Sequence, residues 1–572
     1  MKKESKNKVI IIGLDGGEPS IIDKLTEKEL PNLYRLKREG SSGRLRSTIP
    51  AATAPAWSAF MTGKNPGNTG CIDFIQRVTN NYETTAVDTE MARKEGGIDL
   101  SVLTTQMSGS KRLWEVVSEA GMKVGVMHVP MTYPPLKVDG FMITGLGTPG
   151  TDSEFTYPKE LRSKLLNEFG YKMHITELNV TDREDIALAD LYATERKRKD
   201  VALKLMNTTE WDLFMVVFEG TDYIQHMFWK YMDPTHPQHD SEKAKKYGNA
   251  IYEYYQEVDK FIGELTAKID ENTTVFIMSD HGGASLKKYF YIHKFLKNLG
   301  FLTLKEKSKG SKTLARMGIQ KDLIYSILIK SKLYKIIYKI PKFLRGMVPS
   351  NDYNISDFDW TKTKAFSISG WGMVYINLKG REPNGIVEPG EEYESLRDTI
   401  RHELLNLKDP DSGEAVVKEV LKKEEVYSGK YMDILPDLVC RIDNIECLEI
   451  IPSDNNNDSL FTTQNLKRSG THAKDGIIFA KGNGIKGSYT INKAEIIDLM
   501  PTILYILGIP IPDDMDGSLL EEMFDKTYLY SHPPETVESS NEPQNRSNKE
   551  QQLSKDDEAR IKERLKGLGY LN

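Results

Sequence analysis

The sequence has little cysteine, no long hydrophobic run and no strong excess of charge. Only three of its 572 residues are cysteines, Cys71, Cys440 and Cys447, and no two of them form a C-x-x-C pair. Neither a disulfide framework nor a thiolate metal cluster is therefore expected. No stretch reaches the roughly 18 to 20 apolar residues of a membrane span. The short apolar run 9–14 ends at Asp15, too early for a secretory signal, so we expect a cytoplasmic protein.

The overall charge is mildly acidic. A formal net charge of -6 and a pI of about 6.0 argue against a surface designed for nucleic acid, so no nucleic-acid partner is expected. The length is sufficient for two or more domains with a large core.

The order of elements predicts an α/β fold. A β-branched run at 9–14 is followed by a helical pattern at 20–39, and the alternation recurs further along the chain. The later segments are 113–120 (helix), 123–129 (strand), 202–207 (helix), 213–219 (strand), 245–270 (helix) and 274–278 (strand). Such alternation predicts a mostly parallel central sheet with helices on both faces. Ligands of such sheets bind beyond the carboxyl ends of the strands.

A basic segment interrupts this pattern. Residues 303–350 hold twelve Lys/Arg against Glu306 and Asp322, and their apolar residues recur at helical spacing. One interpretation is a solvated helical insertion whose apolar stripe packs on the core. The other is a lid or interfacial helix pair that meets an anionic substrate or an anionic membrane.

These observations predict a division of the chain. The parts are a catalytic core (1–302 and 471–530), the basic helical insertion (303–350), a smaller α+β cap (351–470), a flexible linker (531–556) and a C-terminal helix (557–572).

Seven residues at the ends of predicted elements carry the chemistry. They are Asp15, Thr53, Asp222, His226, Asp280, His281 and His472. Asp222 and His226 stand one helical turn apart, which places them on one face. Each residue also has an ordinary explanation, as a helix cap, a turn residue or a core histidine. Six metal-type ligands and one hydroxyl meeting at one crevice are harder to explain in that way.

The same residues lie in motifs that resemble those of the alkaline phosphatase superfamily. The motifs are Gly13-Leu-Asp15-Gly, Thr53-x-Pro, Thr62-Gly63, Asp222-x3-His226, Ser279-Asp-His-Gly282, Gly470-Thr-His472 and the segment from Asn492 to Thr502. The closest branch is the type I phosphodiesterase/nucleotide pyrophosphatase group. The resemblance covers roughly residues 8–525.

The resemblance implies two divalent metal ions, zinc first, with manganese or magnesium as alternatives. One ion is expected at Asp222, His226 and His472. The other is expected at Asp15, Asp280 and His281, with the oxygen of Thr53. Two such cations can clamp both the attacking and the leaving oxygen of an in-line displacement. Thr53 is then the expected nucleophile.

Residues around Thr53 refine the expectation. Trp57 stands where related sulfatases have an arginine, which favours a diester over a dianionic monoester; Trp57 is equally explained by core packing. The His and Asn that nucleotide pyrophosphatases commonly carry are replaced by Thr69 and Phe74. Arg44 or Arg46 could supply the missing positive charge.

The sequence therefore predicts a metal-dependent hydrolase of small-molecule phosphate esters, most simply a phosphodiesterase acting through a phospho-threonine. A phosphomutase or phospho-group transferase would use the same intermediate with another acceptor. A metal-binding homologue without turnover is the third hypothesis.

Overall fold

The computed structural model describes most of the chain. The described residues are 7–77, 100–102, 110–176, 182–305, 355–368, 370–441, 448–453, 459–539 and 555–567. The basic insertion predicted at 303–350 lies outside them except for its first three residues. Within the described residues, no helix is both long and apolar enough to cross a membrane.

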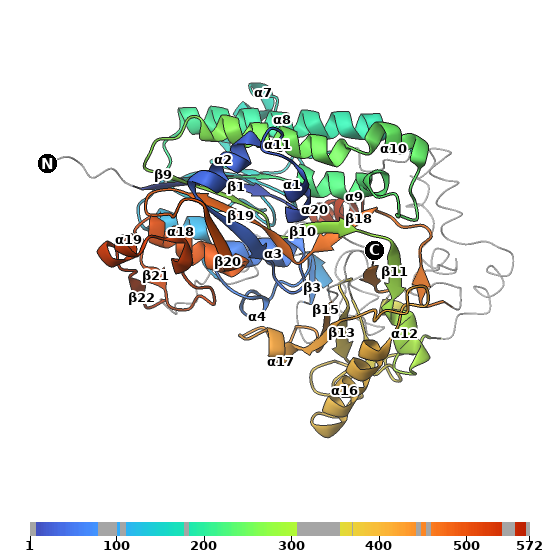
Figure 1. The fold of residues 1–572 in the computed structure, drawn as a ribbon. Coiled ribbons are helices and arrows are strands. Elements are labelled where there is room, and N and C mark those ends of the chain that lie inside the picture. Colours follow the sequence, from blue (N-terminus) through green and yellow to red (C-terminus); the bar gives the residue numbers. More distant parts are fainter. Residues whose placement is uncertain are drawn as a thin grey trace.

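A nine-stranded sheet forms the centre of the molecule (Figure 1). In spatial order its strands are β20 (Tyr489–Glu495), β2 (Ser41–Arg46), β19 (Asp475–Lys481), β9 (Thr273–Met278), β1 (Lys8–Leu14), β8 (Leu213–Phe218), β5 (Val124–Val129), β6 (Gly140–Thr144) and β7 (Thr156–Tyr157). The strands from β9 to β6 are mutually parallel, whereas β19 and β7 run antiparallel to their neighbours. The predicted α/β class with a mostly parallel sheet is confirmed.

Side chains of the central strand alternate between two cores. In β1, Ile10, Ile12 and Leu14 enter one hydrophobic cluster, while Val9 and Ile11 enter the other. This two-residue period follows from the pleat, and both faces are apolar because helices cover both. A sheet buried in this way has its polar residues at the strand ends.

Helices cover each face of the sheet. The first layer comprises α1 (Pro19–Lys24), α2 (Pro31–Glu39), α7 (Glu160–Asn167), α8 (Glu184–Thr208), α9 (Gly220–Met232), α10 (Ser241–Tyr247) and α11 (Ala250–Thr266). The opposite layer comprises α3 (Thr53–Thr62), α6 (Leu113–Glu119) and α18 (Leu499–Ile506), with the short α4 (Pro66–Thr69) beside α3. Figure 1 shows the two layers above and below the sheet.

Two predicted helices are divided in the structure. The segment 20–39 forms α1 and α2 instead of one helix, and 245–270 contains the end of α10 and the whole of α11. The second break falls at Gly248 and Asn249, residues with low helix propensity. The predicted helix at 202–207 is the end of the much longer α8.

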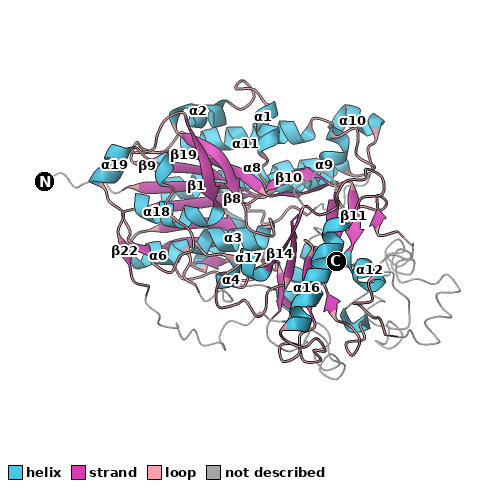
Figure 2. Ribbon diagram, turned by 60° about the horizontal axis from the view of Figure 1, so that its bottom comes forward, coloured by secondary structure: helices cyan, strands magenta, loops and turns pink. Residues whose placement is uncertain are grey.

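The cap packs beside the core with its own hydrophobic cluster (Figure 2). Its four-stranded sheet has the order β12 (Ala365–Phe366), β13 (Met373–Ile376), β15 (Leu438–Arg441) and β14 (Glu419–Lys422). A three-stranded sheet has β11 (Lys288–Tyr291) between β16 (Leu448–Ile451) and β17 (Phe461–Thr462). The cap helices are α12 (Ile292–Asn298), α16 (Glu391–Asn406) and α17 (Lys423–Val426), with a 3-10 turn η2 (Ile355–Asp357). Five residues that precede the boundary predicted at 302 are buried in this cluster: Phe290, Ile292, Phe295, Leu296 and Leu302.

Short elements complete the described chain. They are the pair β10 (Gly282–Ser285) and β18 (Gly470–Ala473), the pair β3 (Ile75–Arg77) and β4 (Leu100–Val102), the 3-10 turns η3 (Ile496–Asp498) and η4 (Glu521–Met523), α19 (Lys526–Ser531), the pair β21 (Ile511–Pro512) and β22 (Thr536–Val537), and α20 (Lys555–Gly567). The segment predicted as a linker, 531–556, thus contains the strand β22, which pairs with β21. In α20, Ile561 and Leu565 are buried beside Ala54.

Candidate metal centre

Three neighbouring parallel strands bring their ligands to one edge of the sheet. Asp15 follows β1 directly, Asp280 and His281 follow β9, and α9, which carries Asp222, begins after β8. Since β9, β1 and β8 are adjacent and parallel, their carboxyl ends meet at one crevice. This edge of the sheet therefore brings together Asp15, Asp222, Asp280 and His281, as the sequence analysis expects.

His472 reaches the same place by strand pairing. In the antiparallel pair of β10 and β18, His472 stands opposite Gly283. This register stacks the His472 ring on the His281 ring, with centroids 3.8 Å apart. A residue almost two hundred positions further along the chain thereby joins the strand-end ligands.

One ligand group contains Asp222, His226 and His472. All three are buried, and each offers a ligand atom within 4.8 Å of the other two. His226 Nε2 lies 3.1 Å from Asp222 Oδ2 and 3.2 Å from His472 Nε2. The i, i+4 spacing on α9 produces the first of these contacts.

Backbone carbonyls fix the orientation of the three histidine rings. Nδ1 of His226 lies 2.7 Å from the Gly470 oxygen, that of His281 2.9 Å from the Gly282 oxygen, and that of His472 3.2 Å from the Ala51 oxygen. A carbonyl oxygen can only accept a hydrogen bond, so Nδ1 of each ring donates and Nε2 is the nitrogen left to face a metal ion. This is the arrangement by which metal-binding histidines are held.

A second ligand group contains Asp15, Asp222 and His281. The sequence interpretation gives this ion Asp280 in place of Asp222. Asp280 lies alongside, with Oδ2 3.3 Å from His281 Nε2. Asp280 Oδ1 accepts a hydrogen bond from the Gly16 amide at 3.0 Å. Gly16 has a φ of +66, and a Cβ added there would lie only 3.0 Å from the Asp222 side chain. Asp222 belongs to both ligand groups.

Two buried carboxylates of the centre each keep one oxygen without a hydrogen-bond partner. These oxygens are Asp15 Oδ1 and Asp280 Oδ2. Burial raises the pKa of Asp15 well above its usual value, and the Asp280 and Asp222 carboxylates raise it further. Burial likewise raises the pKa of Asp280 to about 6. Unpaired buried carboxylates beside three imidazole Nε2 atoms fit divalent cations.

Electrostatics keep the remaining ligands in the states that a metal needs. Burial lowers the pKa of His472 well below its usual value, and the neighbouring His281 lowers it further, so the ring is neutral. Burial alone raises the pKa of Asp222, but the neighbouring His226 outweighs burial and holds that pKa well below its usual range. A neutral imidazole and an ionised carboxylate are both competent ligands.

Thr53 is the first residue of α3 and is fully buried. Its Oγ1 lies 3.2 Å from His281 Nε2. The first amides of a helix have no intrahelical acceptor, so this end of α3 attracts anions. The Ala51 carbonyl accepts a hydrogen bond from His472 Nδ1, and Thr53 Oγ1 lies beside His281 Nε2. The turn that carries Thr53 is therefore held against two histidines of the centre.

The surroundings of Trp57 show whether it packs in the core or lines the site. Trp57 is fully buried in the hydrophobic cluster under the sheet, and its Nε1 donates to Asp15 Oδ2 at 3.2 Å. It therefore packs in the core and orients a ligand. Arg44 and Arg46 are exposed on β2, while Thr69 and Phe74 are buried.

Two residues beside the centre were missed by the sequence interpretation. The Trp371 ring lies 4.9 Å from the His472 ring, and Arg468 Nη1 lies 3.3 Å from His226 Nε2. The available signals were weak: a tryptophan between Gly370 and Gly372, and an arginine four residues before His472.

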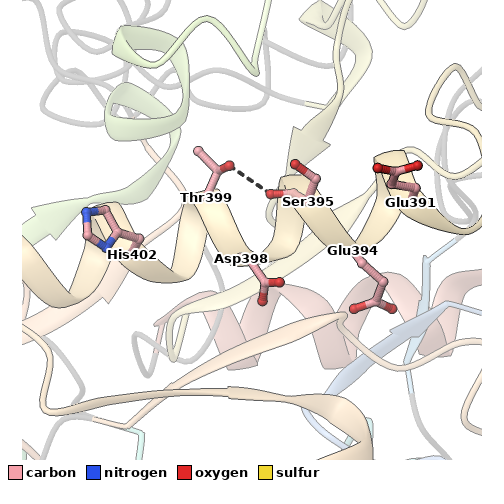
Figure 3. Close-up of a pocket in the computed structure, with 6 residues that line it drawn as sticks. All are labelled: Glu391, Glu394, Ser395, Asp398, Thr399 and His402. Atoms are coloured by element: carbon pink, nitrogen blue, oxygen red, sulfur yellow. Dashed lines mark hydrogen bonds between the residues drawn. The ribbon is translucent and has the colours of Figure 1, made fainter.

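A surface hollow lies away from this centre, along α16. It encloses about 540 Å³, and its lining residues are Glu391, Glu394, Ser395, Asp398, Thr399 and His402. Figure 3 shows all six on one helix, with the Thr399 hydroxyl donating to the Ser395 carbonyl at 2.7 Å. Asp398 is paired with Lys422 at 2.7 Å. The hollow is lined by one exposed helix face with common polar side chains, so the metal centre remains the better candidate for the functional site.

Comparison with known proteins agrees with the geometry. The family model described as type I phosphodiesterase / nucleotide pyrophosphatase matches residues 9–341, more than half of the chain. No curated protein matches significantly. Among solved structures, human ectonucleotide pyrophosphatase/phosphodiesterase 5 is similar, with 13% identity, a TM-score of 0.47, and coverage of 91% of this chain and 100% of that one. The chain belongs to the type I phosphodiesterase/nucleotide pyrophosphatase family.

Proposed function

We propose that this protein hydrolyses phosphodiesters through a phospho-threonine on Thr53, with two divalent cations, most simply zinc. Asp222, His226 and His472 would hold one cation. Asp15, Asp280 and His281 would hold the other, together with Thr53 Oγ1. Nitrogen ligands mixed with carboxylates favour zinc over magnesium, which prefers oxygen.

The observation that carries the proposal is the position of the Thr53 hydroxyl. It is buried at the start of a helix, 3.2 Å from an imidazole nitrogen of the ligand cluster. A threonine that served only to begin the helix would not need its hydroxyl to face a histidine of this cluster. Membership of a phosphodiesterase family supports the reaction class.

The reaction is a double displacement at phosphorus. The Thr53 hydroxyl releases its proton to solvent and Oγ1 attacks the phosphorus. The bond from phosphorus to the leaving ester oxygen breaks, and the leaving group departs as an alcohol with a proton from solvent. Water then attacks the phospho-threonine, which restores the hydroxyl and releases a phosphate monoester. Bound cations would lower the hydroxyl pKa and stabilise the developing charge on both oxygens.

The chain itself contributes positioning. The N-terminus of α3 directs its first amides and the positive end of its dipole towards the phosphoryl group. The buried setting strengthens these interactions because little water competes for them.

Replacement of the nucleophile tests the proposal. Thr53→Ala should lower kcat/KM for bis(4-nitrophenyl) phosphate by at least about a thousandfold, while Thr53→Ser, which keeps a hydroxyl, retains turnover. Zinc content, measured by elemental analysis, should stay near the wild-type value in both variants because the other six ligands remain. Thr53→Ala activity within a few-fold of wild type would exclude the phospho-threonine. Turnover that requires an added alcohol acceptor would instead identify a transferase.

A further inference from the structure

The C-terminal helix α20 packs at the carboxyl edge of the central sheet, beside the start of α3. Two of its apolar side chains, Ile561 and Leu565, are buried in one hydrophobic cluster with Ala54. Ala54 directly follows the proposed nucleophile. Met131 and Leu146, which come shortly after the ends of β5 and β6, belong to the same cluster. The last described helix of the chain is therefore anchored next to the turn that carries the nucleophile.

The same helix also contacts α9, which carries two of the candidate metal ligands. Arg564 Nη2 lies 3.5 Å from the Tyr223 hydroxyl, and Figure 1 shows α20 beside α9. Tyr223 directly follows Asp222, the residue that belongs to both ligand groups. One helix thus contacts the neighbours of the nucleophile and of the shared ligand, on two elements that are far apart in the sequence.

The start of α9 carries a buried carboxylate that needs positive charge nearby. Glu219 immediately precedes the first residue of α9 and is 2% exposed. Arg198 Nη2 lies 3.7 Å from Glu219 Oε2, but Arg198 Nη1 also pairs with Glu195 at 2.6 Å. Burial alone raises the pKa of the Glu219 carboxylate, but His128, Arg198 and Arg564 together lower it to about 2. Arg564 therefore brings part of the compensating positive charge from α20.

Arg564 differs in its surroundings from Arg560 on the same helix. Arg560 pairs with Asp152, whose side chain is 69% exposed. Arg564 Nε, by contrast, is buried and has no hydrogen-bond partner within the described residues. Burial of part of a guanidinium is unfavourable unless negative charge compensates it, and Glu219 provides such charge. Arg564 is thus placed to act on α9, whereas Arg560 offers an internal comparison.

We propose that α20 is a positioning element of the metal centre and that Arg564 is its positioning residue. Arg564 compensates the charge of Glu219 and so holds the first turn of α9, with Asp222, in place. Ile561 and Leu565 fix α20 against the first turn of α3. The position of the nucleophile relative to the shared ligand is thereby set by the end of the chain, outside the matched region 9–341. This proposal rests on the function proposed above.

Zinc affinity of the full-length protein tests the role of the charge. Arg564→Gln should weaken zinc binding about tenfold, the lower end of the effect that partners outside the ligand shell have. Competition with a chromogenic zinc chelator measures the affinity. Arg564→Lys, which keeps the charge, should stay close to wild type. Arg560→Gln removes a guanidinium from the same helix and should match wild type.

Loss of the apolar anchor provides a second variant. Leu565→Ala should weaken zinc binding several-fold in the same assay, because it loosens α20 from α3. Leu404→Ala is the matched control, since Leu404 is likewise fully buried on a helix, but in the cap cluster. It should leave zinc affinity unchanged, so the pair separates a local effect on the centre from a general loss of stability.

Two further readouts distinguish positioning from substrate contact. In excess chelator, hydrogen exchange of residues 219–226 should be faster in Arg564→Gln than in wild type and unchanged in Arg560→Gln. At saturating zinc, Arg564→Gln should lower kcat for bis(4-nitrophenyl) phosphate several-fold with little change in KM, because Arg564 acts through α9 and not by binding the substrate.

The outcomes that overturn the proposal are distinct from those that overturn the proposed function. Wild-type zinc affinity in Arg564→Gln, or equal losses in Arg564→Gln and Arg560→Gln, would show that Arg564 does not position the centre. Equal losses in Leu565→Ala and Leu404→Ala would assign the effect to stability and reject the role of α20. If wild type hydrolyses no diester, the proposed function fails, while zinc affinity and hydrogen exchange still decide the positioning.

Discussion

Two buried aspartates, Asp437 in the cap and Asp280 in the core, have opposite surroundings. Asp437 receives two hydrogen bonds from Arg381, at 2.7 and 2.6 Å, one from Tyr393 at 2.6 Å and one from the Ile376 amide at 2.6 Å. Burial alone raises its pKa, but the Arg381 guanidinium holds that pKa well below its usual range.

Asp280 is equally buried but has no such cation. Its Oδ2 lacks a hydrogen-bond partner, and burial raises its pKa to about 6 despite the neighbouring His281. The cap therefore balances its buried charge with its own residues, whereas the core leaves carboxylates that an external cation would balance. Perturbed pKa values of this kind gather at functional sites, and the contrast separates a structural ion pair from a candidate metal ligand.

The largest expected effect is on stability, and its sign differs between the two sites. In excess chelator, Arg381→Met should lower the free energy of unfolding by about 3–5 kcal/mol, because it leaves Asp437 charged and unpaired. Asp280→Asn should change it little or raise it, since it removes one of several repelling carboxylates. Urea unfolding measures both. Equal destabilisation by the two variants would mean that the core carboxylates are already balanced.

A smaller effect is expected on metal affinity. Trp57→Phe removes the donor that orients Asp15, and loss of such an outer partner typically weakens metal binding about 10–100-fold. Trp114→Phe is the matched control, because Trp114 is fully buried in the same hydrophobic cluster. Competition with a chromogenic zinc chelator reports the affinity. The same loss in both variants would assign the effect to packing.

The smallest effect concerns His128, which is buried beside the Glu219 carboxylate and the Arg198 guanidinium. Its Nε2 lies 3.2 Å from Glu219 Oε2, and Arg198 Nη2 lies 3.7 Å from the same oxygen. Burial, reinforced by Arg198, lowers the His128 pKa from 6.5 to about 4. Between these values the unfolded chain binds the proton and the folded chain does not.

The stability that His128 contributes is therefore complete above pH 6.5 and is lost as the pH falls towards 4. His128→Gln should flatten the decline in unfolding free energy over this window, measured in urea at several pH values. An unchanged slope would show that His128 titrates alike in both states.

The sequence predicts some of these features better than others. The strand-end ligands are predictable because parallel strands align their carboxyl ends, and because Asp222 and His226 are one helical turn apart. The partners in the β10–β18 pair depend on long-range register, so the stacking of His472 on His281 was not foreseen. Arg468 and Trp371 reach the centre through long-range contacts that leave no local pattern in the sequence. The helix predicted at 245–270 is broken at Gly248 because glycine has a low helix propensity. The apolar periodicity of the segment continues across this break, so it does not reveal it.

The stoichiometry of bound metal tests the central claim most directly. After exhaustive chelation and reconstitution with zinc, elemental analysis should find two ions per chain and recovery of diester hydrolysis. Asp222→Asn should bind one ion or fewer and lose turnover, because Asp222 borders both ligand groups. Asp398→Asn, on the exposed face of α16, should match wild type. Full turnover in chelated, metal-free protein, or less than one ion bound by wild type, would contradict the account.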